Sequence, residues 1–213
     1  MYIGRKMILI LSGGIGSGKS VAAGMLSEMY GFPVYCADRR VKELYDEHPV
    51  LLSDIEKMLG CVLRDEDGRF VPSSLAREIF ADNGVLEKVE ALVFPVLKKD
   101  FEKWMGEHPS RVHVLESATI LEKDFFKGFG DLALVVTAPS EVRLERAIAR
   151  DSASQMQVRA RMEKQKMMND PALLESRCTL PYMVCENAGT LDDLRSNLAE
   201  IMKKSGLTKM LYR

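Results

Sequence analysis

The sequence predicts an α/β fold with a mainly parallel β-sheet flanked by helices. Met7 to Leu11 form an unbroken apolar run, which is typical of a strand buried on both faces of a parallel sheet. From Lys19 to Tyr30, apolar residues recur at helical spacing, and Gly31 follows where that helix is expected to end. Strand-like and helical stretches alternate along the rest of the chain, as they do in α/β proteins.

The other elements of this core are predicted by the same patterns. A helix is expected from Ser140 to Arg150, directly after Pro139. Thr190 and Asp193 are spaced as a variant capping box before a last amphipathic helix, which Gly206 would terminate. The remaining strands are expected at 33–36, 112–116, 132–137 and 182–185, and the last helix at 191–204.

A mostly helical insertion is expected from Asp38 to Met105. Its pattern is interrupted by His48-Pro49, by the turn Asp65 to Gly68, and by Phe94-Pro95. We therefore expect several short helices here, with a break at each of these points.

The composition excludes several classes of protein. The 213 residues have the length of a single domain, and 46% hydrophobic with 29% charged residues is ordinary globular composition. With 30 Lys and Arg against 31 Asp and Glu, no basic surface for nucleic acid is expected. The apolar run near the start is too short for a membrane span or a signal peptide. The four cysteines lack the spacing of a zinc site or disulfide framework, so we expect reduced thiols in a cytoplasmic protein.

The segment Gly13 to Ser20 matches the pattern G-x-x-x-x-G-K-[ST] and lies between a predicted buried strand and a helix. In such a P-loop, glycines allow consecutive N–H groups to point at a phosphate beside the positive end of the following helix. Lys19 would act on the β- and γ-phosphates of ATP during transfer, and Ser20 would be a ligand of Mg²⁺. The sequence therefore predicts a P-loop NTPase-type fold, with nucleotide contacts from Gly14, Gly16, Ser17, Gly18, Lys19 and Ser20.

Asp38 follows the second predicted strand, at the edge where ligands bind in open α/β sheets. A carboxylate there can accept the proton of an attacking hydroxyl or hold a water bound to Mg²⁺. The alternative is a helix cap, because aspartate is favoured at that position.

Three arginines, Arg143, Arg146 and Arg150, share one face of the helix after the fourth strand. They either form a solvated face with Glu141 and Glu145, or they bind phosphoryl oxygens, as lid arginines do in kinases. We assign Arg146 to catalysis and Arg150 to nucleotide binding.

Together these segments resemble the dephospho-coenzyme A kinase family over nearly the whole chain. The resemblance runs through Ser12 to Ser20, Val34 to Asp38, Gly68, Leu75, Ile79-Phe80, Leu121-Glu122, Leu134 to Val136, Arg143-Leu144, Arg146, Arg150, Arg161, Gln165, Val184, Asn187 and Gly189. It implies an ATP- and Mg²⁺-dependent kinase that phosphorylates the ribose 3′-hydroxyl of dephospho-coenzyme A. It also implies that the ATP-binding stretch runs from Gly16 to Val21, that Asp38 activates that hydroxyl, and that Asn187 lies near the adenine of ATP.

The resemblance divides the domain into a core at about 1–37, 111–150 and 170–213, a helical acceptor-binding lobe at about 38–110, and a short lid at about 150–165. Several positions depart from the family pattern: Cys36 replaces the first aspartate of an Asp-x-Asp pair, and Val21, Pro72-Ser73, Phe94 and Ala118 to Glu122 also differ. Two alternatives therefore remain at this stage. One is another P-loop kinase of a nucleotide or small metabolite, and the other is a nucleotide-binding regulator with weak transfer.

Overall fold

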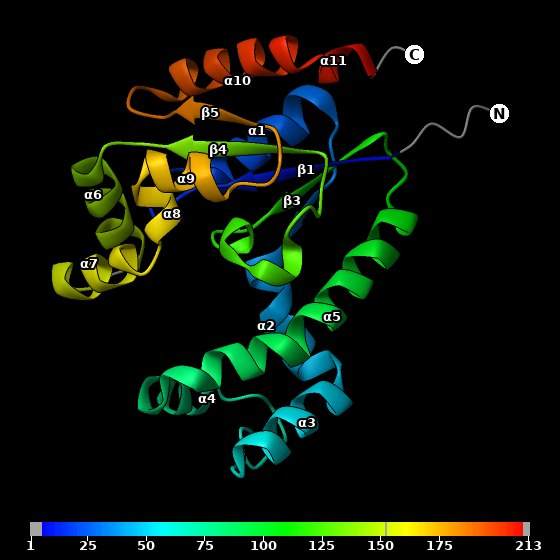
Figure 1. Ribbon diagram of the computed structural model, residues 1–213, viewed down its shortest axis with the longest axis vertical. Helices are drawn as coiled ribbons and strands as arrows, with labels where there is room; N and C mark the ends of the chain where they lie inside the picture. The colour runs from blue at the N-terminus through cyan, green and yellow to red at the C-terminus, as the bar shows by residue number, and fades with distance from the viewer. Residues whose placement is uncertain (1–5, 152, 211–213) are drawn as a thin grey trace. The chain divides into compact units, whose positions relative to one another are not determined.

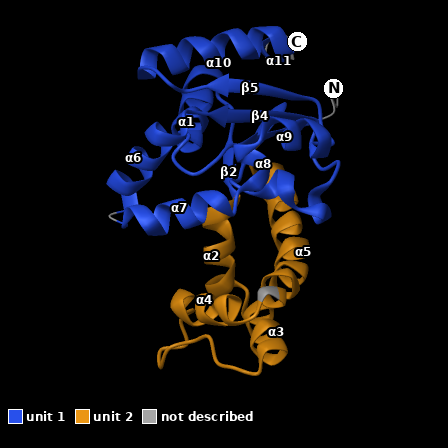
Figure 2. Cartoon of the chain, turned by 60° about the vertical axis from the view of Figure 1, so that its left-hand side comes forward, with its two compact units in different colours: residues 1–36, 109–213 blue, residues 37–108 orange. Residues whose placement is uncertain are grey.

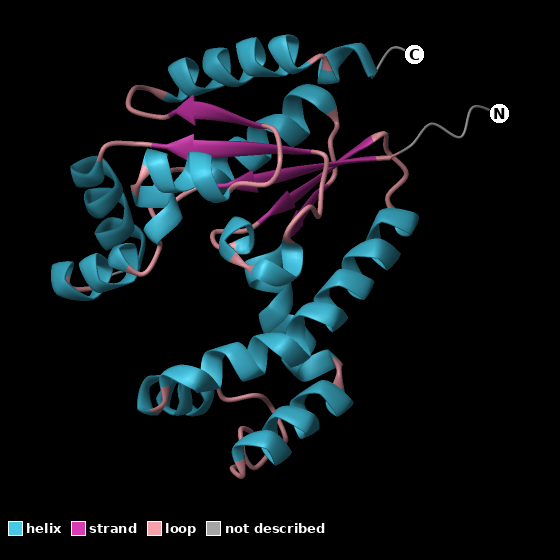
Figure 3. Ribbon diagram, in the orientation of Figure 1, coloured by secondary structure: helices cyan, strands magenta, loops and turns pink. Residues whose placement is uncertain are grey.

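The structure, a computed structural model, describes residues 6–151 and 153–210. The chain divides into two compact units, which Figure 2 distinguishes by colour: Met1–Cys36 with Pro109–Arg213, and Ala37–His108. The strands of the described residues all lie in the first unit (Figure 3). The second unit is helical, apart from an isolated β-bridge between Arg64 and Phe70.

A five-stranded parallel sheet forms the centre of the first unit, in the order β2-β3-β1-β4-β5 (Figure 1). The strands are β1 Met7–Ser12, β2 Val34–Cys36, β3 Val112–Glu116, β4 Leu132–Thr137 and β5 Tyr182–Glu186. The predicted α/β class is confirmed, and each strand ends within one residue of the expected position. Because the strands are parallel, their carboxyl ends share one edge of the sheet, where the chain leaves β1 for the glycine-rich loop.

Both faces of the sheet are covered, as its continuous apolar strands require. Leu134 and Val136 of β4 belong to a buried cluster with α1 (Lys19–Tyr30) and α10 (Leu191–Ser205). Val135, between them, packs instead with α8 (Lys166–Asn169) and α9 (Pro171–Arg177). Neighbouring residues on one strand thus face opposite layers, and each fully buried side chain of this size contributes about 1.5–3 kcal/mol.

The helices of the first unit begin and end where local signals place them. Gly31 and Gly206 end α1 and α10 in the left-handed conformation, with φ of 67° and 75°. The predicted capping box of Thr190 and Asp193 is present. The remaining helices of this unit are α6 Ser140–Asp151, α7 Gln155–Glu163, α11 Leu207–Met210 and the 3₁₀ turns η1 Ile120–Glu122 and η2 Asp124–Phe126.

In the second unit, the described helices are α2 Ala37–Glu47, α3 Pro49–Leu59, α4 Pro72–Ala81 and α5 Asn83–Glu107. The expected break at His48-Pro49 is confirmed: His48 caps α3 and Pro49 begins it. The turn from Asp65 to Gly68 is also confirmed, because the Gly68 N–H donates a hydrogen bond of 3.0 Å to the Asp65 carbonyl.

The expected break at Phe94-Pro95 is wrong, because α5 continues through Pro95 to Glu107. Proline in a helix removes one backbone hydrogen bond and costs about 3 kcal/mol. The helix is nevertheless continuous because its inner face packs at four-residue spacing, with five buried side chains at Val85, Val89, Val93, Leu97 and Phe101. Their combined burial outweighs one lost bond.

Candidate active site

The loop from Gly13 to Gly18 joins β1 to α1 at the carboxyl edge of the sheet, as predicted. Gly18 precedes α1 with a φ of 95°, and no side chain caps the start of the helix. The first N–H groups of α1 and its positive end are therefore free of a capping side chain, which suits an anion. Lys19 and Ser20 are the first two residues of this helix.

The glycines of the loop fit their positions because protein encloses one side of each. A Cβ at Gly14 or Gly16 would collide with Arg143, and one at Gly13 with the Val136 carbonyl. At Gly18 it would collide with the side-chain amide of Asn187. Residues with a side chain are therefore excluded at these four positions, and only glycine fits there.

Ser20 contacts a carboxylate that sequence reasoning did not assign to the metal site. Its hydroxyl donates a hydrogen bond of 2.7 Å to Oε1 of Glu116, the last residue of β3, which is buried. The available signal was an acidic residue at the end of an apolar strand. Serine and carboxylate oxygens are ligands that Mg²⁺ accepts, so the side chains present fit this ion.

Among the described residues, no group of three or more His, Cys, Asp or Glu side chains is placed to hold a metal ion. Mg²⁺ in kinases typically uses one or two protein ligands together with phosphate oxygens and waters. Ser20 and Glu116 together would provide two protein ligands, which is the number expected for such a site.

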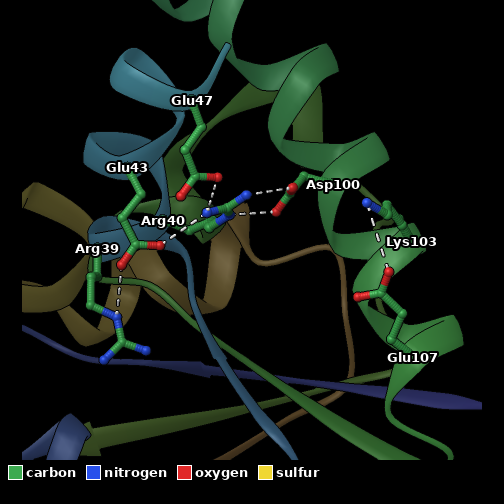
Figure 4. Close-up of polar contacts among 7 residues, drawn as sticks. All are labelled: Arg39, Arg40, Glu43, Glu47, Asp100, Lys103 and Glu107. Atoms are coloured by element: carbon green, nitrogen blue, oxygen red, sulfur yellow. Dashed lines mark hydrogen bonds and ion pairs between the residues drawn. The ribbon is translucent and has the colours of Figure 1, made fainter. Parts of the chain in front are cut away.

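Asp38 belongs to the second unit, where it lies in the first turn of α2. Two positions further on, Arg40 joins α2 to the middle of α5 (Figure 4). Its Nε and Nη2 donate to the two carboxylate oxygens of Asp100 at 2.8 and 2.9 Å, and these bonds raise the pKa of Arg40. Nη1 pairs with Glu43 and Glu47 of the same helix.

The three arginines of α6 do not act alike. Arg143 is buried, and its Nε donates a hydrogen bond to the Ile15 carbonyl in the loop from Gly13 to Gly18 (the phosphate loop). The interpretation as part of a solvated face is therefore wrong for this residue. Nη1 of Arg146 donates to the Asn187 carbonyl at 3.1 Å. Arg150 forms two bonds with Asp151, which also accepts one from Arg161, and these bonds lower the pKa of Asp151 to about 2.

Asn187 lies at the phosphate loop, directly after β5. It is buried, and its Nδ2 donates a hydrogen bond of 2.8 Å to the Ser17 carbonyl. Arg146 therefore reaches the loop through Asn187. Val21, the last residue of the predicted nucleotide-binding stretch, is 45% exposed on the first turn of α1.

The model of one protein family, described as dephospho-CoA kinase, matches residues 7–193. This match includes the loop, all five strands and the helical insertion. The chain belongs to the dephospho-CoA kinase family. It is therefore an ATP-dependent phosphotransferase with dephospho-CoA kinase activity, as the sequence indicated.

Individual relatives and solved structures show the same likeness. The chain is 40% identical over 156 residues to the dephospho-CoA kinase of Porphyromonas gingivalis. These aligned residues are 73% of this chain and 76% of the relative. A crystal structure of the Thermus thermophilus protein TT1252 matches with a TM-score of 0.76 at 28% identity, over 94% of this chain and 98% of the other. The dephospho-CoA kinase from Campylobacter jejuni shares the fold, with a TM-score of 0.65 at 18% identity and coverage of 96% and 98%.

None of the helices in the described part of the chain is long and apolar enough to cross a bilayer.

Proposed function

We propose that the loop from Gly13 to Ser20 binds the phosphates of ATP and that Asp38 activates the ribose 3′-hydroxyl of dephospho-CoA. The observation that carries this proposal is the loop itself. Three features support a phosphate and metal site there: one side of the loop admits only glycine, no side chain caps the start of α1, and Ser20 is hydrogen-bonded to Glu116.

The loop amides and Lys19 bind and orient the phosphates. Lys19 carries a mobile positive charge at the start of α1, where charge shifts onto the leaving phosphate oxygen as the bond breaks. A cation in that position stabilises the transition state more than the ground state and therefore raises kcat. Arg146, anchored on Asn187 beside the loop, is proposed to neutralise charge on the transferred phosphoryl group.

Ser20 and Glu116 are the residues proposed to hold Mg²⁺. When bound, the ion would neutralise charge on the β- and γ-phosphates. In the structure, the Ser20 hydroxyl donates a hydrogen bond to Glu116, which leaves the oxygen lone pairs of Ser20 available for a cation.

Asp38 is proposed as the general base. A ribose hydroxyl is a poor nucleophile near neutral pH, and a carboxylate that accepts its proton contributes about 10²- to 10⁴-fold. Cys36 stands where the family pattern has the first aspartate of the Asp-x-Asp pair, so Asp38 acts without the negative charge of that neighbour.

The remaining assignments rest on the family resemblance. Residues 38–110 are proposed as the acceptor-binding lobe and 150–165 as the lid, with Arg150 contacting the nucleotide and Asn187 lying near the adenine. The proposed cytoplasmic location is supported by the four cysteines, which form no disulfide among the described residues: Cys36, Cys61, Cys178 and Cys185.

The experiment compares Asp38→Asn with Asp54→Asn, a matched change on α3 of the same unit, where Asp54 pairs only loosely with Lys57 at 3.7 Å. Asp38→Asn is expected to lower kcat with dephospho-CoA by about 10²-fold or more while ADP affinity, measured by calorimetry, is unchanged. Asp54→Asn should leave both values unchanged. Normal turnover in folded Asp38→Asn would reduce Asp38 to a helix-terminal residue and redirect the search to Glu116 and Glu122.

A further inference from the structure

The backbone of Ile15, in the middle of the phosphate loop, is held from both sides by side chains distant in sequence. Its N–H donates a hydrogen bond of 2.7 Å to Oε1 of Gln165, and its carbonyl accepts one of 3.0 Å from Nε of Arg143. Both side chains are at least 91% buried, with 9% of Gln165 and 5% of Arg143 exposed. Neither residue is needed for the roles assigned above.

These two bonds fix the turn of the loop. The Ser17 N–H donates to the Gly14 carbonyl at 3.1 Å, and Gly16 has a φ of 75°, as expected at the third position of a type II turn. Type I and type II turns differ mainly in the direction of their central peptide, which here joins Ile15 to Gly16. The bond from Arg143 holds that peptide in one of the two directions.

The direction of this peptide determines what the loop presents to a ligand. The described peptides are trans, so the C=O and N–H of one peptide point in opposite directions. With the Ile15 carbonyl bonded to Arg143, the Gly16 N–H points away from Arg143. In the same way, the hydrogen bond that the Ile15 N–H donates to Gln165 turns the Gly14 carbonyl away from Gln165 and toward its partner, the Ser17 N–H.

Both side chains are in turn tied to α7 and α8. Gln165 lies between these helices, and Asn169 at the end of α8 accepts a bond of 2.9 Å from Nη1 of Arg143. The side-chain amide of Asn169 also donates to the Met162 carbonyl of α7. The side chain of Ile15 itself packs in a cluster with α6 and α7 that includes Leu144, Ala147, Val158 and Met162.

From this arrangement we infer that Gln165, together with Arg143, is a positioning residue for phosphate binding, which sets the turn of the loop and couples it to α7. The inference rests on the proposed nucleotide role of the loop but requires no acceptor. Loss of the Gln165 bond leaves a buried N–H unsatisfied and frees the turn, so nucleotide affinity falls even though Gln165 touches no phosphate.

The chain offers a matched control at the other end of β1. The Ile8 N–H donates to Oδ2 of Asp131 at 2.9 Å, so Asp131→Ala also removes a side-chain acceptor from a backbone N–H, but distant from the loop along the same strand. Gln165→Ala removes the acceptor at the loop, and Gln165→Glu keeps an acceptor oxygen at that position, in a carboxylate in place of the carboxamide.

The experiment measures ADP affinity by calorimetry and thermal stability for these three variants and the wild-type protein. We expect Gln165→Ala to raise the ADP Kd by on the order of tenfold. Asp131→Ala should lower the Tm by a similar amount but leave the ADP Kd unchanged. Gln165→Glu should recover most of the ADP affinity that Gln165→Ala loses. Equal ADP affinity in Gln165→Ala and Asp131→Ala would overturn the inference, as would a Gln165→Glu protein as weak as Gln165→Ala. Because no acceptor is present, a failure here is distinct from a failure to phosphorylate dephospho-CoA.

Discussion

The ion pair of Arg40 and Asp100 is predicted to be the strongest electrostatic link between α2 and α5 among those described. It is bidentate, and only 23% and 20% of the two side chains are exposed. Charge-assisted hydrogen bonds contribute about 1.5–3 kcal/mol, whereas exposed pairs contribute about 0.2–1 kcal/mol. For this half-buried, two-bond geometry we expect a coupling free energy of about 1.5 kcal/mol.

The assay is a double-mutant cycle with Arg40→Ala, Asp100→Ala and the double variant, in which the free energy of unfolding is measured in urea. Trp104 is the one tryptophan of the chain and lies on α5 in the second unit, so its fluorescence reports on that unit. The control cycle uses Lys103 and Glu107 on the same helix, a pair 3.7 Å apart with 77% and 57% of the side chains exposed (Figure 4). This pair should couple by no more than about 0.5 kcal/mol.

A coupling of Arg40 and Asp100 no larger than that of the control pair would refute this reasoning. The attraction between Arg40 and Asp100 would then be too strongly screened by water to stabilise the packing of α2 against α5. A measured coupling of the expected size would also mean that the first turn of α2, which carries Asp38, is fixed by a contact 60 residues away in sequence.

Three further predictions concern single side chains. Lys19→Ala should abolish phosphoryl transfer without changing the far-UV CD spectrum, because Lys19 acts on phosphate charge. Activity within a few-fold of wild type would contradict the assignment of the loop. Arg146→Ala should lower kcat more than it raises the KM for ATP, whereas unchanged kcat with raised KM would reassign Arg146 to ground-state binding. Asp151 has a folded pKa of about 2, below its ordinary value of 3.8, so its ion pairs stabilise the fold above about pH 4 and are lost as the pH falls toward 2. The Tm difference between wild type and Asp151→Asn should therefore be present at pH 5 and much smaller near pH 2, where about half of the Asp151 carboxyl groups are protonated in the folded protein. A difference as large at pH 2 as at pH 5 would contradict this.

Local signals in the sequence predicted most of the fold. The strands, the helix ends at Gly31 and Gly206, and the capping box at Thr190 depend on neighbouring residues, whose types can be read directly. The break expected at Pro95 was wrong because the opposing effect, packing along one face of α5, involves partners distant in sequence.

The same limit applies to the site. The loop and its link to Ser20 follow from a contiguous motif, but the contacts of Ser20 with Glu116 and of Ile15 with Gln165 join residues 96 and 150 positions apart. Arg143 shares its helix face with Arg146 and Arg150, so spacing alone did not distinguish a buried support of the loop from a solvated arginine. Only the fold brings these residues together.

The most direct test of the proposed function is a coupled ADP-release assay with ATP, Mg²⁺ and dephospho-CoA, run beside AMP as a nucleotide acceptor. We predict ADP release that requires dephospho-CoA and yields coenzyme A with a new 3′-phosphate, at a rate well above that with AMP. ADP release that is independent of dephospho-CoA, or that is faster with AMP, would contradict the proposed acceptor.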